Sequence, residues 1–140
     1  MHRLIEHSFA EYRGRLEPPS SALDETVATI TAAMAVGGAV LALAGDRPIG
    51  AALYRPDAGF LYAGRVSVMP EWRRQGVAQA LMGFLETQAR SLALSAIEIE
   101  VRESLPSNVA LYRRLSYRVT ASIPHPRGPS FNSLTMRKEV

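Results

Sequence analysis

The sequence predicts an α/β (α+β) domain in which helices flank a mixed, mostly antiparallel sheet. Short apolar segments rich in β-forming residues alternate with segments whose apolar residues recur at helical spacing, in the order α-α-β-β-β-α-β-α-β-β. The 140 residues, 47% hydrophobic and 21% charged, are enough for one compact unit with its own core. We therefore expect residues 1–140 to form a single domain.

Two helices are expected before the first strand. Residues 2–15 carry apolar side chains at approximately helical spacing, and a glycine and two prolines follow. A second helix begins after Ser21 or Asp24, either of which can cap it, and stops at Gly37. Its apolar residues recur at intervals of four, three and four: Leu23, Val27, Ile30 and Met34.

Three antiparallel strands follow as a meander. Residues 39–54 and 58–69 are apolar and β-capable, and the turns "GDRP" and "RPDAG" interrupt them. The remaining elements are a helix with one apolar stripe, an alternating strand, a short helix and two strands separated by a proline-rich loop. Their expected bounds are 75–92, 96–101, 108–115, 117–122 and 131–136, with the loop at 123–130.

Composition excludes several kinds of function. The absence of cysteine rules out disulfides, thiolate metal sites and a cysteine nucleophile, and no metal is expected. The longest nearly apolar run, residues 32–45, is too short to span a bilayer, so we expect a cytoplasmic protein with no membrane partner. A net charge of +3 with scattered arginines argues against binding of nucleic acid.

The stretch "VMPEWRRQGVA", residues 68–78, places two arginines and a glycine where a helix begins. A helix start has unpaired N–H groups and a partial positive charge, and it favours an anion. Gly76 keeps side-chain bulk away from those N–H groups, and Arg73 and Arg74 can add charge-assisted hydrogen bonds. The stretch is neither a Walker A loop nor a dinucleotide fingerprint. Either it binds a phosphate or diphosphate, or its arginines are solvated loop charges.

Two segments resemble a known family. "VSVMPEWRRQGVAQALM", residues 66–82, is similar to the acyl-CoA-binding signature of the GNAT acyltransferase superfamily, with Arg73, Gly76 and Ala78 in the signature positions. "NVALYRRLSY", residues 108–117, resembles the second signature of that family. Together with the order of the elements, the resemblance covers most of the chain.

The resemblance implies acetyl-CoA as the acyl donor. Its diphosphate would lie on the amides of residues 74–78, and its pantetheine arm along the end of the preceding strand. The thioester would meet an amine where two central parallel strands, residues 61–69 and 96–102, splay apart. The implied acetyl-CoA contacts are Val68, Arg73, Arg74, Gln75, Gly76, Val77, Ala78 and Asn108. Asn108 bonds the cofactor arm, or it caps the helix that it begins.

Tyr112 matches the family tyrosine that lies near the sulfur and is often assigned as the general acid. The resemblance implies that Tyr112 protonates the departing thiolate or positions the thioester. A purely structural reading also stays open, in which Tyr112 anchors the short helix together with Leu111 and Leu115.

The general base is harder to assign. Glu98 and Glu100 alternate outward from an apolar strand face, which favours solvent exposure or ion pairing over catalysis. Tyr62 and His125 are the candidate acceptor-side residues. His125 titrates near neutral pH in an ordinary environment and is expected near the substrate mouth, or it is a loop histidine held between two prolines. A water chain, or an amine that arrives neutral, would need no base.

The chain departs from the family pattern in two places. Ser116 replaces the usual glycine and would disturb the tight turn after the short helix. The usual first β-strand is also lacking, so that either the start is truncated or this member lacks that edge. An exposed sheet edge would favour self-association, for example as a homodimer, or would lower stability.

The resemblance therefore implies an N-acetyltransferase that passes an acetyl group directly to a primary amine in a ternary complex. The acceptor is a small molecule or a peptide, and residues 11–25 and 123–131 would select it. The alternative is a non-catalytic acyl-CoA-binding or regulatory module of the same fold.

Overall fold

The computed structural model describes residue 3, residues 35–128 and residues 131–140. The two helices expected near the N-terminus, and the expectation that the first strand is missing, lie outside these residues. Residues 35–36 are helical and Gly38 begins the first described strand, in agreement with a helix that stops at Gly37.

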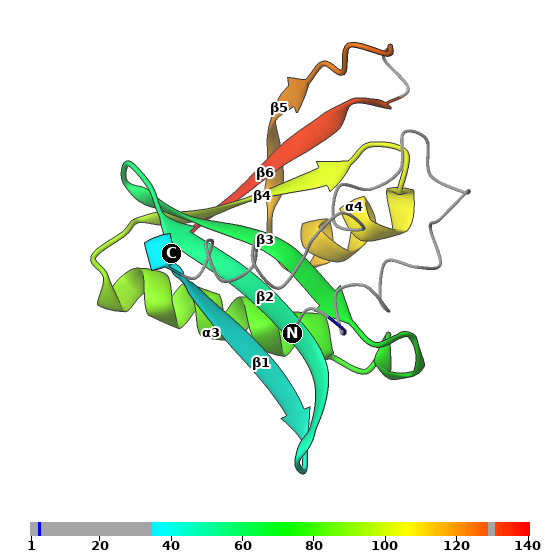
Figure 1. Ribbon diagram of the computed structural model, residues 1–140. Helices are drawn as coiled ribbons and strands as arrows, with labels where there is room; N and C mark the ends of the chain where they lie inside the picture. The colour runs from blue at the N-terminus through cyan, green and yellow to red at the C-terminus, as the bar shows by residue number, and fades with distance from the viewer. Residues whose placement is uncertain (1–2, 4–34, 129–130) are drawn as a thin grey trace.

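The described residues form six strands, two α-helices and a short 3-10 turn (Figure 1). Their order follows the expected one from the first strand onward. The bounds are β1 (Gly38–Ala44), β2 (Arg47–Pro56), β3 (Phe60–Val68), η2 (Pro70–Trp72), α3 (Val77–Ser91), β4 (Ala96–Arg102), α4 (Pro106–Arg114), β5 (Arg118–Ile123) and β6 (Ser133–Glu139).

The described strands make one sheet in the order β1-β2-β3-β4-β6-β5. The pair β3 and β4 is parallel, and the other four neighbouring pairs are antiparallel. This confirms the mixed, mostly antiparallel sheet and the opening meander. It also places the parallel pair in the middle of the sheet, where the sequence indicated it.

The core lies between the sheet and the two described helices. Leu85 and Met82 of α3 pack with Ile97 and Ile99 of β4, and Tyr112 of α4 belongs to the same cluster. The two helices therefore cover the same face. The outward alternation of the β4 glutamates is confirmed, since that strand buries its isoleucines against this cluster.

Several expected element bounds need correction. The helix expected at 75–92 is Val77–Ser91, because Arg74 (φ 61°) and Gly76 (φ 84°) take left-handed conformations that a helix cannot contain. The helix expected at 108–115 begins earlier, at Pro106, where proline suits the first helical position. The strands expected at 117–122 and 131–136 are Arg118–Ile123 and Ser133–Glu139. The last strand runs later than expected because it pairs with the whole of β4, from Ser133 opposite Arg102 to Glu139 opposite Ala96.

Candidate active site

The parallel pair β3 and β4 separates partway along its length. Backbone pairing runs from Phe60 opposite Ala96 to Ala63 opposite Ile99, and no further pair follows although both strands continue. Figure 1 shows the two strands diverging toward the end at which α4 lies. The expected splay is therefore confirmed.

A β-bulge in β3 accompanies the splay. In the pairing with β2, Ala51 lies opposite Ser67 but Leu53 lies opposite Gly64, so two residues of β3 face one of β2. One of the two, Arg65, has a φ of 51°, and its carbonyl accepts a hydrogen bond from Ser67 Oγ at 3.0 Å. A bulge bends its strand and increases the local twist, which turns β3 away from β4.

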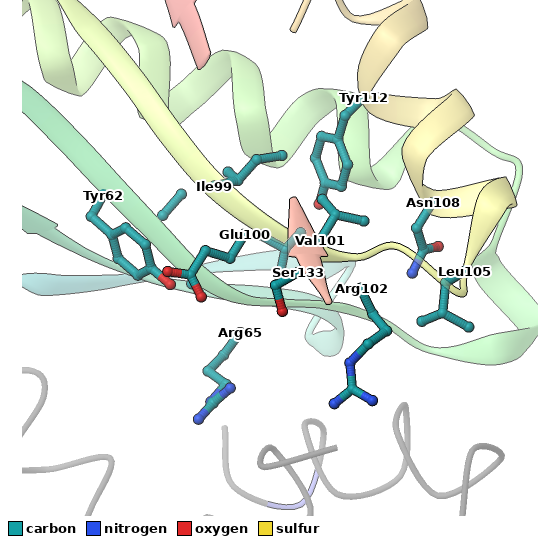
Figure 2. Close-up of a pocket in the computed structure, with 13 residues that line it drawn as sticks. Tyr62, Arg65, Ile99, Glu100, Val101, Arg102, Leu105, Asn108, Tyr112 and Ser133 are labelled. Carbon is teal, nitrogen blue, oxygen red and sulfur yellow. The ribbon is translucent and has the colours of Figure 1, made fainter. Parts of the chain in front are cut away.

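A pocket of about 190 Å³ occupies the splay. Residues of β3, β4, α4 and β6 line it, and Figure 2 shows the polar ones converging from both strands and from α4. The polar or charged side chains among them are Tyr62, Arg65, Glu100, Arg102, Asn108, Tyr112 and Ser133. Three residues that the sequence singled out, Tyr62, Asn108 and Tyr112, thus share one pocket.

Tyr112 presents its hydroxyl to this pocket from α4 (Figure 2). The side chain is 8% exposed, and burial raises the pKa of its hydroxyl well above the ordinary value, so it stays protonated at neutral pH. The ring also belongs to the main core cluster. No residue in the described ranges forms a hydrogen bond with this hydroxyl, so its direction depends on how the ring is packed.

Asn108 lies in the first turn of α4, and its side chain borders the pocket beside Leu105. The expectation that Asn108 caps this helix is wrong. Leu105 occupies the cap position, and no side chain there makes a capping hydrogen bond. The amide of Asn108 therefore faces the pocket rather than its own helix end.

Tyr62 and Glu100 meet on the β3 and β4 sides of the pocket. Figure 2 shows the hydroxyl of Tyr62 and the carboxylate of Glu100 pointing toward one another. Burial, followed by the negative charge of Glu100, raises the pKa of Tyr62, while the guanidinium groups of Arg55 and Arg65 act in the opposite direction. The Arg55 guanidinium lies 4.4 Å from the centre of the Tyr62 ring.

Glu100 is the site residue that sequence reasoning missed. The two β4 glutamates have different surroundings: Glu98 forms an ion pair with Arg137 at 2.6 Å, whereas Glu100 is exposed and lines the pocket. The expectation of ion pairing or exposure is confirmed for Glu98 and for Glu100, but Glu100 is exposed to the pocket. The distinguishing signal is position, because Glu100 directly follows Ile99, the last β4 residue paired with β3.

The basic turn lies between the end of β3 and the start of α3. Arg73 Nε donates to the carbonyl of Val68 at 3.3 Å, and Gln75 Nε2 donates to the carbonyl of Glu71 at 3.0 Å. Burial lowers the pKa of Arg73. Arg74 is exposed. Much of the side-chain polarity of this turn is thus engaged with its own backbone.

The first turn of α3 presents backbone rather than side chains. Gly76 has open space around it, since a Cβ there would meet nothing within 4 Å. No side chain caps the helix, its first turn contains no acidic residue, and Val77 is buried in a cluster with Ile49 and Leu81. Ala78 is half-buried and small. The N–H groups of this turn can therefore approach an anion closely.

His125 is not among the residues that line the pocket. It lies in the loop after β5, where its Nδ1 accepts a hydrogen bond from the Arg127 amide at 3.1 Å and its ring contacts Phe131 edge-on. Its own amide donates to Asn132 Oδ1 at 3.1 Å. The structure thus gives His125 a loop-stabilising role. Its assignment to the acceptor side stays a prediction.

Two negative findings concern other kinds of site. Across residues 35–128 and 131–140, no group of three or more histidine or acidic side chains is arranged to hold a metal ion. Nor does this part of the chain contain a helix long and apolar enough to cross a membrane.

Solved structures with the same fold include acetyltransferases. Ard1 from Thermoplasma volcanium aligns over 100% of this chain and 93% of its own, with 19% identity and a TM-score of 0.78. A GNAT family acetyltransferase from Elizabethkingia anophelis, solved with acetyl-CoA bound, aligns over 82% and 84%, with 16% identity and a TM-score of 0.72. The ribosomal-protein-S18-alanine N-acetyltransferase from Escherichia coli aligns over 97% and 87%, with 17% identity and a TM-score of 0.71. At these identities the likeness shows the fold alone.

Sequence comparison carries the assignment further. A search of curated proteins finds no match. The model of the acetyltransferase (GNAT) family matches residues 1–117, a span that includes the splayed strands, the basic turn and both candidate signatures. The chain therefore belongs to the GNAT acetyltransferase family.

Proposed function

We propose that this protein transfers an acetyl group from acetyl-CoA directly to the primary amine of a small molecule or a peptide. One observation carries the proposal. The pocket at the splay places a protonated tyrosine, Tyr112, and a carboxylate, Glu100, around a single cavity. Residues 62–66 of β3 line that cavity, and β3 leads into the basic turn at the start of α3.

The basic turn is suited to the diphosphate of acetyl-CoA. Gly76 leaves room for a ligand against the helix start, and the absence of an acidic residue in the first turn of α3 leaves its positive end unopposed. Arg73 lies against the carbonyl of Val68 and stiffens the turn, whereas Arg74 is placed at its rim. Backbone amides from Arg74 to Ala78 thus provide most of the binding, and charge at the rim assists.

The thioester would extend from the turn along β3 into the pocket, with Asn108 available to bond the pantetheine arm. The amine nitrogen attacks the thioester carbonyl carbon, a carbon–nitrogen bond forms, and the carbon–sulfur bond breaks. The amine loses one proton, and the departing sulfur gains one. The pocket must therefore accept a proton on one side and stabilise a thiolate on the other.

Glu100 and Tyr112 divide these tasks. Glu100 accepts the proton from the amine, since it is the carboxylate among the described residues that line the pocket. Tyr112 donates a hydrogen bond to the sulfur. Because burial raises its pKa, Tyr112 is a weak acid, and stabilising the thiolate by hydrogen bonding is easier for it than complete proton transfer. The thiolate then takes its proton from water as CoA leaves. Without a cysteine, no thiol-linked acyl-enzyme intermediate can form.

The test is a screen of the full-length protein with acetyl-CoA and a panel of polyamines, α-amino acids and peptides with a free N-terminus. Release of free CoA thiol that depends on both the protein and one of these amines supports the proposal. Calorimetry measures acetyl-CoA binding in parallel. Tight acetyl-CoA binding without turnover of any amine would indicate a non-catalytic acyl-CoA-binding module instead, and absence of binding would contradict both.

A further inference from the structure

A partly buried ionic cluster lies outside the lining of the pocket and takes no part in the proposed reaction. Glu86 of α3 is 9% exposed, although the other buried residues of that helix are apolar. Its Oε1 accepts a hydrogen bond from Lys138 Nζ of β6 at 2.8 Å, and its Oε2 accepts one from the Tyr117 hydroxyl at 3.4 Å. Lys138 is the single lysine of the chain.

Placing charged groups at a core position costs free energy, because the charges lose their contact with water. A buried ion pair must recover the cost of removing both charges from water, and apolar side chains of similar volume are often equally stabilising. The Glu86 carboxylate ties together α3, β6 and the start of β5 through defined atoms, which a leucine could not do. Unlike an apolar side chain at this position, the Glu86 carboxylate therefore fixes the direction of the Tyr117 side chain.

Tyr117 in turn contacts Tyr112. Their rings pack edge-to-face, with centres 5.9 Å apart and planes at 78°. The Tyr117 amide donates to the Tyr112 carbonyl at 2.9 Å, and the Ser116 amide donates to the Arg113 carbonyl at 3.0 Å. This pair of bonds forms a Schellman motif at the end of α4 and brings the two tyrosines together. The Lys138 ammonium lies 5.8 Å from the centre of the Tyr117 ring.

We propose that Glu86 and Lys138 are positioning residues for Tyr112 and that they act through the ring of Tyr117. This inference rests on the proposed function, in which Tyr112 serves the departing sulfur. Since no described residue bonds the Tyr112 hydroxyl, ring packing alone directs it. The Tyr117 ring packs against one side of the Tyr112 ring, and the ion pair of Glu86 and Lys138 prevents the Tyr117 ring from rotating away.

The first variant to test is Lys138→Met, which removes the ammonium and keeps a long unbranched side chain. Misdirecting a reacting group by a fraction of an ångström to one ångström has large kinetic effects, so kcat should fall about tenfold. The KM for acetyl-CoA should stay within about twofold, because the donor diphosphate binds elsewhere, at the start of α3.

Lys138→Arg keeps the charge and should restore most of kcat. Tyr117→Phe removes one hydroxyl and offers a milder break of the same cluster should Lys138→Met fold poorly.

The matched control is Arg118→Met. It removes a 3.1 Å ion pair between Arg118 and Glu139, which directly follow Tyr117 and Lys138 in the chain but have exposed side chains. Its kcat should equal that of the parent chain. Thermal melting of each variant sets an assay temperature at which all of them are folded, and the substrates are acetyl-CoA and the panel amine that reacts fastest.

The decisive measurement repeats Lys138→Met in a Tyr112→Phe background. If the cluster acts through the Tyr112 hydroxyl, Lys138→Met lowers kcat in the parent chain but has no further effect after Tyr112→Phe. An equal loss of kcat in both backgrounds would overturn the positioning role. A loss on Tyr112→Phe with none on Lys138→Met or Tyr117→Phe would overturn it too and leave the proposed function standing. An unchanged kcat on Tyr112→Phe would overturn the role of Tyr112 and this inference with it.

Discussion

The turn before α3 and the turn after α4 both contain left-handed backbone, and they use it in opposite ways. Gly76, with a φ of 84°, precedes α3, and a side chain added there would meet open space. Ser116, with a φ of 74°, follows α4 and lies between Arg113 and the buried Tyr117, inside a closed hydrogen-bonded turn. In the turn before α3, the backbone N–H groups are left available to a ligand. In the turn after α4, the backbone N–H groups of residues 116 and 117 bond carbonyls of the helix itself.

The comparison separates binding from chemistry. Before α3, function depends on backbone amides and on the absence of side-chain bulk. Around the pocket and the end of α4, function depends on side chains, which other side chains hold in place. Substitutions at the first turn should therefore change donor affinity, substitutions of the side chains around the pocket should change turnover, and a substitution of Ser116 in the second turn should change stability.

The largest effect is expected from Gly76→Glu. A carboxylate would occupy the open space before α3, repel the donor phosphates and pair with the positive helix end, so acetyl-CoA affinity should fall by at least about 100-fold. Calorimetry measures this loss. Gly76→Ala is the matched control, since it carries the left-handed strain of about 1 kcal/mol without the charge. Equal losses in both variants would show that strain, rather than blocked anion binding, matters at this turn.

Glu100→Gln should lower kcat about 100-fold, the usual scale for loss of a general base, with little change in acetyl-CoA affinity. Glu98→Gln is the control from the same strand, because its carboxylate pairs with Arg137 rather than lining the pocket. Steady-state assays with the fastest panel amine give both constants. If Glu98→Gln and Glu100→Gln reduce kcat equally, the distinction between the two glutamates is wrong.

Stability should decline at alkaline pH because the tyrosines beside the second turn are buried. Burial raises the pKa of Tyr112 and Tyr117 above the ordinary 10.0, and the Glu86 carboxylate contributes further at Tyr117. Above pH 10 the unfolded chain loses these protons while the folded chain keeps them, so rising pH favours unfolding. Between the pKa of the unfolded chain and that of the folded chain, each tyrosine lowers the free energy of unfolding by about 1.4 kcal/mol per pH unit. Below pH 10 neither tyrosine reduces the free energy of unfolding.

Urea denaturation at several pH values between neutral and strongly alkaline measures this slope. Tyr117→Phe removes one of these two buried tyrosines and should reduce the slope. An identical slope in the parent chain and in Tyr117→Phe would mean that Tyr117 deprotonates as readily in the folded protein as in the unfolded one.

The smallest effect is expected from Ser116→Gly. Glycine adopts the left-handed conformation without the steric cost that a serine side chain imposes, and part of the gain is lost because glycine makes the unfolded chain more flexible. The free energy of unfolding should rise by about 0.5–1 kcal/mol. Thermal and urea melts measure it. A decrease would show that the Ser116 side chain stabilises the turn, and the expected disturbance by serine would then be wrong.

Much of this fold follows from local patterns. The apolar runs, the turns between them and the alternation of residues 96–101 predict the meander and the strand β4, since each depends on neighbouring residues. The splay was expected from the family resemblance, which also implies that Tyr112 and Asn108 contact the donor. Ser116 was expected to disturb the tight turn after α4, yet that turn closes as a Schellman motif.

The rest depends on contacts between distant segments. Strand alternation places Glu98 and Glu100 on one face but does not say where β3 leaves β4, and that point alone separates an ion-paired glutamate from one in the pocket. The bulge at Arg65 arises in the pairing of β2 with β3. Glu86 has the spacing of a helix position facing the core, and only the structure shows its bonds to Lys138 and Tyr117.

The central claim is that the donor diphosphate binds at the start of α3 while the reaction takes place in the pocket. The most direct test is a titration of isotope-labelled protein with CoA and with acetyl-CoA, in which the backbone amide resonances are monitored. Both ligands should shift the amides of Gly76, Val77 and Ala78 strongly, because both carry the diphosphate. Acetyl-CoA should in addition shift the amides around Glu100 and Tyr112 beyond the change that CoA produces. Saturation with acetyl-CoA that leaves the amides of residues 76–78 unmoved would contradict the proposed binding of the donor at the start of α3.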